Sequence, residues 1–213
     1  PPEVVPLPDV PYWAEVTAPV APLRAWCAAD APLLGRIGHG GLALVIDTLP
    51  ADQPGMAWYG IADANGELFG WTPGVRWGVM KSLPVGESLR PSSAMANREN
   101  FIEIALSTYT LTAWEDNTAI LAAPVSLGTD IQPGSYALQR RQPAITWSDS
   151  IEGQTWYGVP WAIDLGAAGL LTGAYWHNRF GAAAPGPALQ VSPALARWLY
   201  HWLNDGGAII IKA

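Results

Sequence analysis

A stretch near the end of the chain has the surroundings of a nucleophilic site but lacks a nucleophile. Residues 177–193 read HNRFGAAAPGPALQVSP and are followed by ALARWLYHW. A histidine such as His177 can take a proton from a serine or cysteine held within hydrogen-bond reach. Positions 185–188, between a glycine turn and a capped helix, hold Pro, Gly, Pro and Ala, and none of these has a nucleophilic atom. The stretch therefore predicts the frame of an active site without its reacting group.

Other chemically active residues are sparse. Cys27 is the only cysteine, so no internal disulfide can form, and its apolar context predicts a small buried hydrophobe. His39, His177 and His201 lie far apart in sequence, and no metal site or cofactor is expected. Ser192 directly precedes a proline and a helical pattern, which favours a role as N-cap rather than nucleophile.

Composition limits the function classes. Half of the 213 residues are hydrophobic and 14% are charged, which is typical of a globular protein, while 20 prolines and 22 glycines indicate short strands and tight turns. The net charge of −7 is spread over both halves without a basic patch, so nucleic acid is not an expected partner. No apolar run reaches the length of a membrane helix, and the sequence contains no charged-then-apolar signal segment, so a leader or anchor upstream of Pro1 stays open.

The first part of the chain predicts an extended arm and a small β domain. Residues 1–12 are rich in proline and are expected to form an arm or linker. Residues 13–83 contain short strand-like runs such as LALVID and AWYGIAD, with Asn65-Gly66 favouring a tight hairpin turn. Residues 84–99 form a polar connector, where we place the domain boundary.

The second part, residues 100–213, predicts further strands and one main helix. Strand-like runs cover 101–106, 108–114 and 119–125, around a turn at 115–117. A helix is expected over 193–203, since Ser192 can cap it and Pro193 suits its first position. The apolar face of this helix should comprise Leu195, Trp198, Leu199 and Trp202. Gly206-Gly207 should end the helix, and AIIIKA should form a closing strand.

Residues 13–83 resemble the bacterial SH3-like domain. The resemblance is carried by AEVTAPVAPLRAWCAADAPLLGRIGHGGLALV and WYGIADANGELFGWTP. It implies that a strand with Trp58 and Tyr59 and a strand with Gly70 and Trp71 close a small barrel.

Residues 100–213 resemble the L,D-transpeptidase (YkuD-type) catalytic domain. The matching segments are FIEIALSTYTLTAWEDNTAILAAPVSLG, the PGSY segment at 133–136, YWHNRFG at 175–181 and the helix segment VSPALARWLYHW. The resemblance implies a β-sandwich with one main helix. The expected fold class is thus mainly β, with an SH3-like barrel followed by an L,D-transpeptidase-like sandwich.

The same resemblance indicates which reactive residues are missing. Because both flanks fix the alignment, the family's Ser-His-Gly-Cys motif falls on Pro185, Gly186, Pro187 and Ala188. The family's general base is matched by His177, and Gln190 stands where an asparagine is common. Proline at 187 also removes a backbone N–H from the loop where the family gathers donors around an oxyanion. The active-site motif is therefore degenerate.

Function follows from this resemblance as an expectation. It implies a catalytically inactive protein that acts as a structural or binding component of a bacterial cell envelope, outside the cytoplasm, with peptidoglycan or envelope proteins as partners. The expected binding residues are Tyr175, His177, Asn178, Arg179 and Gln190. Two alternatives stay open: an active L,D-transpeptidase or other peptidoglycan-modifying enzyme with a non-standard nucleophile, and a subunit of a larger assembly. His177 can also be retained for packing alone.

Overall fold

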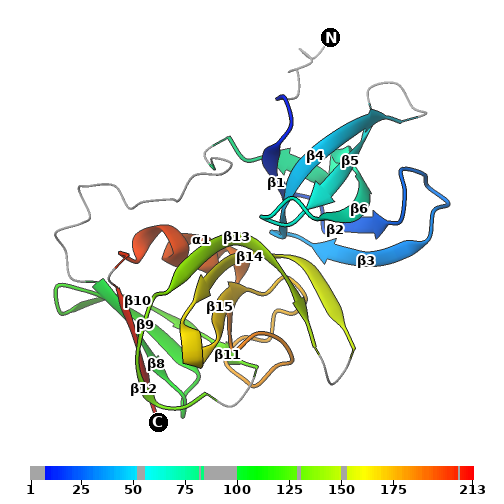
Figure 1. The fold of residues 1–213 in the computed structure, drawn as a ribbon. Coiled ribbons are helices and arrows are strands. Elements are labelled where there is room, and N and C mark those ends of the chain that lie inside the picture. The colour runs from blue at the N-terminus through cyan, green and yellow to red at the C-terminus, as the bar shows by residue number, and fades with distance from the viewer. Residues whose placement is uncertain are drawn as a thin grey trace. The chain divides into compact units, whose positions relative to one another are not determined.

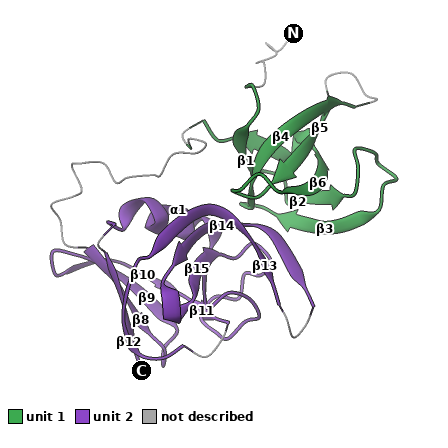
Figure 2. Cartoon of the chain, in the orientation of Figure 1, with its two compact units in different colours: residues 1–87 green, residues 88–213 purple. Residues whose placement is uncertain are grey.

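The computed structural model describes residues 8–51, 56–81, 83, 100–128, 131–149, 153–205 and 207–213. The chain divides into two compact units, residues 1–87 and 88–213 (Figure 2). The predicted connector, 84–99, lies outside the described residues. Those residues are mainly β, with one α-helix, as the sequence predicts. In this part of the chain, no helix has the length and apolar character needed to cross a membrane.

The first unit is built on one antiparallel sheet, ordered β3-β2-β6-β5-β4-β1-β7 (Figure 1). Its elements are β1 (Tyr12–Val16), β2 (Val20–Arg24), β3 (Leu33–Gly38), β4 (Leu42–Pro50), β5 (Ala57–Ala62), β6 (Leu68–Pro73), the 3-10 helix η1 (Gly74–Arg76) and β7 (Trp77–Val79). The SH3-like barrel stays a prediction, since the strand pairing ends at β3 on one side and at β7 on the other. Cys27 is half-buried rather than buried, which corrects the expectation for this residue.

The hairpin between β5 and β6 forms at the predicted turn. The Asp63 carboxylate accepts hydrogen bonds from the backbone N–H groups of Asn65, at 2.8 Å, and Glu67, at 2.9 Å. Gly66 has φ +83°, a conformation that costs glycine little. The strands with Trp58-Tyr59 and Gly70-Trp71 pair with each other, as expected.

The second unit contains two five-stranded sheets, ordered β10-β9-β8-β17-β12 and β11-β16-β15-β14-β13 (Figure 1). The elements of the first sheet are β8 (Asn100–Ala105), β9 (Thr110–Glu115), β10 (Thr118–Pro124), β12 (Gly134–Ala137) and β17 (Ala208–Lys212). Those of the second are β11 (Ser126–Leu127), β13 (Arg140–Ser148), β14 (Thr155–Asp164), β15 (Leu170–Gly173) and β16 (Leu189–Val191), with the 3-10 helix η2 (Gly166–Ala168) between β14 and β15. The predicted strands thus exist with bounds shifted by one or two residues, because the turn at 115–117 uses Asp116 and Asn117 at positive φ.

The helix α1 (Pro193–Trp202) packs against β14 and β15. Its N-terminus is capped as predicted, because Ser192 Oγ accepts a hydrogen bond from the Leu195 N–H at 3.3 Å. It ends at Trp202, followed by Leu203 in an extended conformation, so the glycines at 206–207 do not end it.

The buried face of α1 differs from the predicted one. It consists of Ala196, Leu199, Tyr200 and Trp202, whereas Trp198 is 37% exposed. The reason is that helical periodicity selects a stripe of apolar residues but does not decide which edge of that stripe faces the sheet. Trp198 instead stacks on Trp202, with ring centroids 4.8 Å apart.

Candidate functional site

The predicted loop joins two parallel neighbouring strands, β15 and β16, and its carbonyl groups face inward. The Gln190 side-chain amide donates to the carbonyls of Ala184, at 3.1 Å, and Pro187, at 3.0 Å. The Trp176 indole N–H donates to the carbonyl of Pro185 at 3.2 Å. Three of the four residues at 184, 185, 186 and 187 therefore present acceptors to side-chain donors.

The two prolines reduce the number of backbone donors in the loop. Stabilising a developing oxyanion requires N–H donors aimed at one point. Pro185 and Pro187 have no backbone N–H, and their carbonyls are the groups that point at Gln190 and Trp176. Among residues 185–188, backbone N–H donors therefore remain only at Gly186 and Ala188.

The hydrogen bonds of Gln190 also determine the tautomer of His177. Both hydrogens of the Gln190 amide nitrogen are used by the two loop carbonyls, so the oxygen Oε1 must face His177. His177 Nε2 lies 2.8 Å from that oxygen and therefore donates. The remaining nitrogen, Nδ1, is buried and has no hydrogen-bond partner among the described residues. His177 consequently has no lone pair at Nε2 with which to accept a proton.

A cavity of about 210 Å³ lies beside His177. It is lined by Gln154, Trp156, Trp176, His177, Arg179, Ala184 and Pro185. Two of the predicted binding residues, His177 and Arg179, lie in its wall. Gln190 does not line the cavity but is hydrogen-bonded to His177. Arg179 is exposed at the side chain, while its carbonyl accepts a hydrogen bond from Ser126 Oγ at 3.0 Å.

The other two predicted binding residues are placed differently. The Tyr175 hydroxyl donates to the carbonyl of Tyr157 at 2.6 Å, and burial raises the pKa of Tyr175 above its usual range. Tyr175 thus stabilises the strand end. Asn178 is exposed and does not line the cavity. Their roles in binding stay predictions.

Sequence reasoning missed the aromatic part of the site. Trp156 in β14 lies between Trp147 and Trp176, with ring centroids 5.1 Å and 5.2 Å away. His177 continues the row, 6.1 Å from Trp176 and 4.9 Å from Phe180. The high tryptophan content is the signal that was present in the sequence, but only strand pairing brings these rings together.

The side chain of Ala188 is buried against neighbouring residues. It is 8% exposed, and a Cβ built on Gly169 would lie 2.8 Å from the Cβ of Ala188, so the methyl group faces the start of β15. The resemblance to the L,D-transpeptidase domain also implies that His177 lies in a groove next to position 188, and this stays a prediction. On β15, Thr172 pairs with Gln190, and residues paired in this way point to the same face of the sheet. Thr172 is buried, and its Oγ1 lacks a partner among the described residues.

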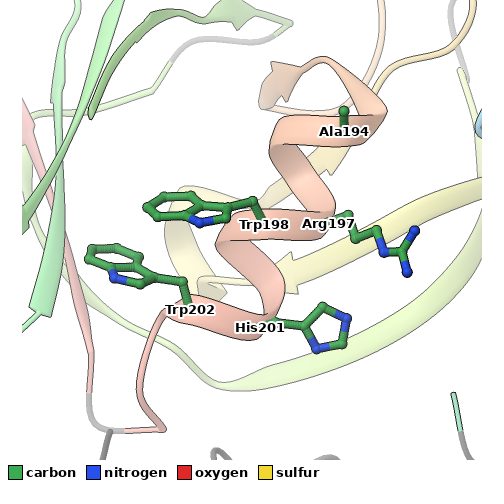
Figure 3. A pocket seen from close by; sticks show the side chains of 5 residues that line it. All are labelled: Ala194, Arg197, Trp198, His201 and Trp202. Carbon is green, nitrogen blue, oxygen red and sulfur yellow. The ribbon is translucent and has the colours of Figure 1, made fainter. Parts of the chain in front are cut away.

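A second, open hollow of about 390 Å³ runs along α1 and is lined by Ala194, Arg197, Trp198, His201 and Trp202 (Figure 3). Figure 3 shows the two indoles on one side of the helix, with Arg197 and His201 on the other. None of the loop residues contributes to it. Within the described ranges, no group of three His, Cys, Asp or Glu side chains is arranged to hold a metal ion.

Comparison with known proteins identifies the fold. No family model and no curated relative matches the sequence. The structure is similar to an L,D-transpeptidase from Mycobacterium smegmatis, with a TM-score of 0.50 and 18% identity over 94% of this chain and 99% of that one. The similarity to an L,D-transpeptidase from Mycobacterium tuberculosis H37Rv has a TM-score of 0.48 and 15% identity, over 93% of this chain and 98% of that one. The similarity to the Enterococcus faecium L,D-transpeptidase has a TM-score of 0.46 and 13% identity over 54% of this chain. The chain spans only 50% of that protein. The chain therefore has the fold of the L,D-transpeptidases.

Proposed function

We propose that this chain is a non-catalytic L,D-transpeptidase-like protein that binds peptidoglycan in a bacterial cell envelope, outside the cytoplasm. The fold supports the link to peptidoglycan, because the similar M. smegmatis protein is an L,D-transpeptidase. The observation that carries the inactive assignment is the loop at 184–188. Its carbonyls are bound by Gln190 and Trp176, and the aligned nucleophile position holds a buried alanine.

The proposal follows from what acyl transfer requires. A thiolate must attack a carbonyl, a base must activate the thiol, and donors must stabilise the oxyanion. Ala188 supplies no nucleophile, Pro187 supplies no N–H donor, and His177 has no thiol at position 188 to activate. Loss of one oxyanion donor alone costs about 10²–10³ in rate, and loss of the nucleophile removes the covalent route altogether.

The cavity beside His177 supports retained binding. Its wall combines indole rings with the side chains of Gln154, His177 and Arg179, which are the groups that recognise polar polymers with anionic substituents. Arg179 is placed to attract a carboxylate, because its side chain is exposed at the cavity wall.

Two measurements on the wild-type chain test the two halves of the proposal. Incubation with a carbapenem such as imipenem, followed by intact mass spectrometry, should show no acyl adduct. Co-sedimentation with purified peptidoglycan should show saturable binding, which Arg179→Gln weakens. Arg36→Gln, at an exposed position in the first unit, is the matched control and should bind like wild type. An acyl adduct would overturn the inactive assignment and favour an enzyme with a non-standard nucleophile, and absent sedimentation would overturn the binding role.

A further inference from the structure

Three tryptophans form a fixed row that leads into the cavity beside His177. Trp147 in β13 and Trp156 in β14 are paired across the two strands. Trp156 is only 5% exposed and lies between the other two rings, while Trp147 and Trp176 are half-buried. The row therefore presents two accessible indoles held in place by one buried indole.

The row is preorganised for stacking. Trp147 is tilted by 42° and Trp176 by 38° relative to Trp156, and Trp176 is further fixed by its bond to the Pro185 carbonyl. Because the rings are already immobile, a ligand that stacks on them pays little side-chain entropy. The two outer centroids are separated by at most the two successive steps of 5.1 Å and 5.2 Å, a span comparable to one disaccharide unit.

Hydrogen-bonding side chains accompany the row. Gln154 and Arg179 lie in the wall of the adjoining cavity. A flat apolar ring face next to amide and guanidinium groups matches a pyranose, which has C–H groups on its faces and hydroxyls around its edge.

We propose that Trp147 and Trp176 bind the glycan strand of peptidoglycan by stacking on two sugar rings about one disaccharide unit apart, with Arg179 pairing with a carboxylate carried by the strand. The inference rests on the proposed binding function and names the part of the polymer that is recognised. A peptide ligand would use the cavity by itself, whereas a glycan strand extends from the cavity along the indoles to Trp147.

The test uses the full chain and a neutral probe, the tetrasaccharide of β-1,4-linked N-acetylglucosamine. Titration followed by NMR of the indole N–H signals should shift Trp147 and Trp176 saturably. Trp147→Ala should weaken binding about three- to tenfold, the loss expected for one aromatic contact. Trp147→Tyr, which keeps a flat ring, should restore most of it. Trp198→Ala removes an exposed indole from α1 and is the matched control, with no effect expected.

Two further probes separate the ligand sources. Arg179→Gln should leave the neutral tetrasaccharide unaffected but weaken binding of peptide-free glycan strands that carry carboxylates. A synthetic stem peptide should leave the Trp147 signal unchanged. Saturable binding of whole peptidoglycan without any tetrasaccharide shift at Trp147, or a shift caused by the peptide instead, would overturn the glycan assignment while leaving the proposed function intact. Lack of binding to whole peptidoglycan would overturn both.

Discussion

His177 Nε2 donates a hydrogen bond to Gln190 Oε1 at 2.8 Å, while the amide nitrogen of Gln190 bridges the carbonyls of Ala184 and Pro187. One buried side chain thus fixes both the histidine and the loop that precedes it. The arrangement stabilises the fold and leaves the lone pair of the neutral His177 ring on Nδ1, which is buried and has no hydrogen-bond partner among the described residues.

Replacing Gln190 should destabilise the second unit. In Gln190→Leu the two loop carbonyls and His177 Nε2 lose their partners, and buried groups left without partners cost about 2–4 kcal/mol in total. Urea unfolding should show this loss, whereas Gln139→Leu, at an exposed position, should change the free energy of unfolding by less than about 0.5 kcal/mol. In the wild type, ¹⁵N NMR should show His177 as the Nε2–H tautomer. A neutral Nδ1–H form would contradict the assigned amide orientation.

Restoring the cysteine alone should not restore acylation. In Ala188→Cys the thiol faces the start of β15, next to Gly169, and Pro187 still supplies no N–H donor. Intact mass spectrometry with a carbapenem should show no adduct. Alkylation by iodoacetamide should modify Cys27 first, because that residue is half-buried whereas position 188 is 8% exposed. A carbapenem adduct at position 188 would mean that the loop opens enough to support chemistry.

Gly186 should tolerate no side chain. Its φ is +137°, and an added Cβ would lie 2.9 Å from both the Gln190 amide and the Trp176 ring. Gly186→Ala should therefore lower stability by about 2–4 kcal/mol, through backbone strain and overpacking together. Gly66→Ala separates the two effects, since Gly66 has φ +83° with open space around it. This variant should lose only about 1 kcal/mol of stability, from backbone strain alone. Equal losses in thermal unfolding would show that the loop relaxes.

His201 should make stability fall at mildly acidic pH. Burial lowers the pKa of His201, and the charges of Arg197 and Arg141 lower it further. Its ring contacts those of Trp161 and Tyr200, with centroids 5.4 Å and 5.3 Å away. Because the unfolded chain binds a proton at this histidine more readily than the folded chain, its contribution is complete above the unfolded pKa, about 6.5, and is lost as pH falls below it.

The measurement is urea unfolding between pH 7.5 and pH 5. His201→Gln should flatten the pH dependence over this range. His39→Gln, an exposed histidine in the first unit, should leave it unchanged. A steeper pH dependence in His201→Gln would mean that folding does not lower the pKa of His201.

Local patterns in the sequence determined most secondary structure. Asn65-Gly66 specifies its hairpin because glycine tolerates the positive φ that the turn needs. Ser192 and Pro193 specify the start of α1 because a hydroxyl acceptor and a fixed φ suit a helix N-terminus. The absence of a nucleophile at 185–188 is likewise a property of residue types alone.

Only the tertiary structure decided what the remaining loop does. The alternation of apolar residues does not indicate that β15 and β16 are parallel neighbours. This pairing places Thr172 opposite Gln190. The inward carbonyls of the loop, the tautomer of His177 and the row from Trp147 to Trp176 depend on contacts between residues far apart in sequence. Such contacts form when non-local strand pairing brings the residues together, and no local propensity encodes that pairing.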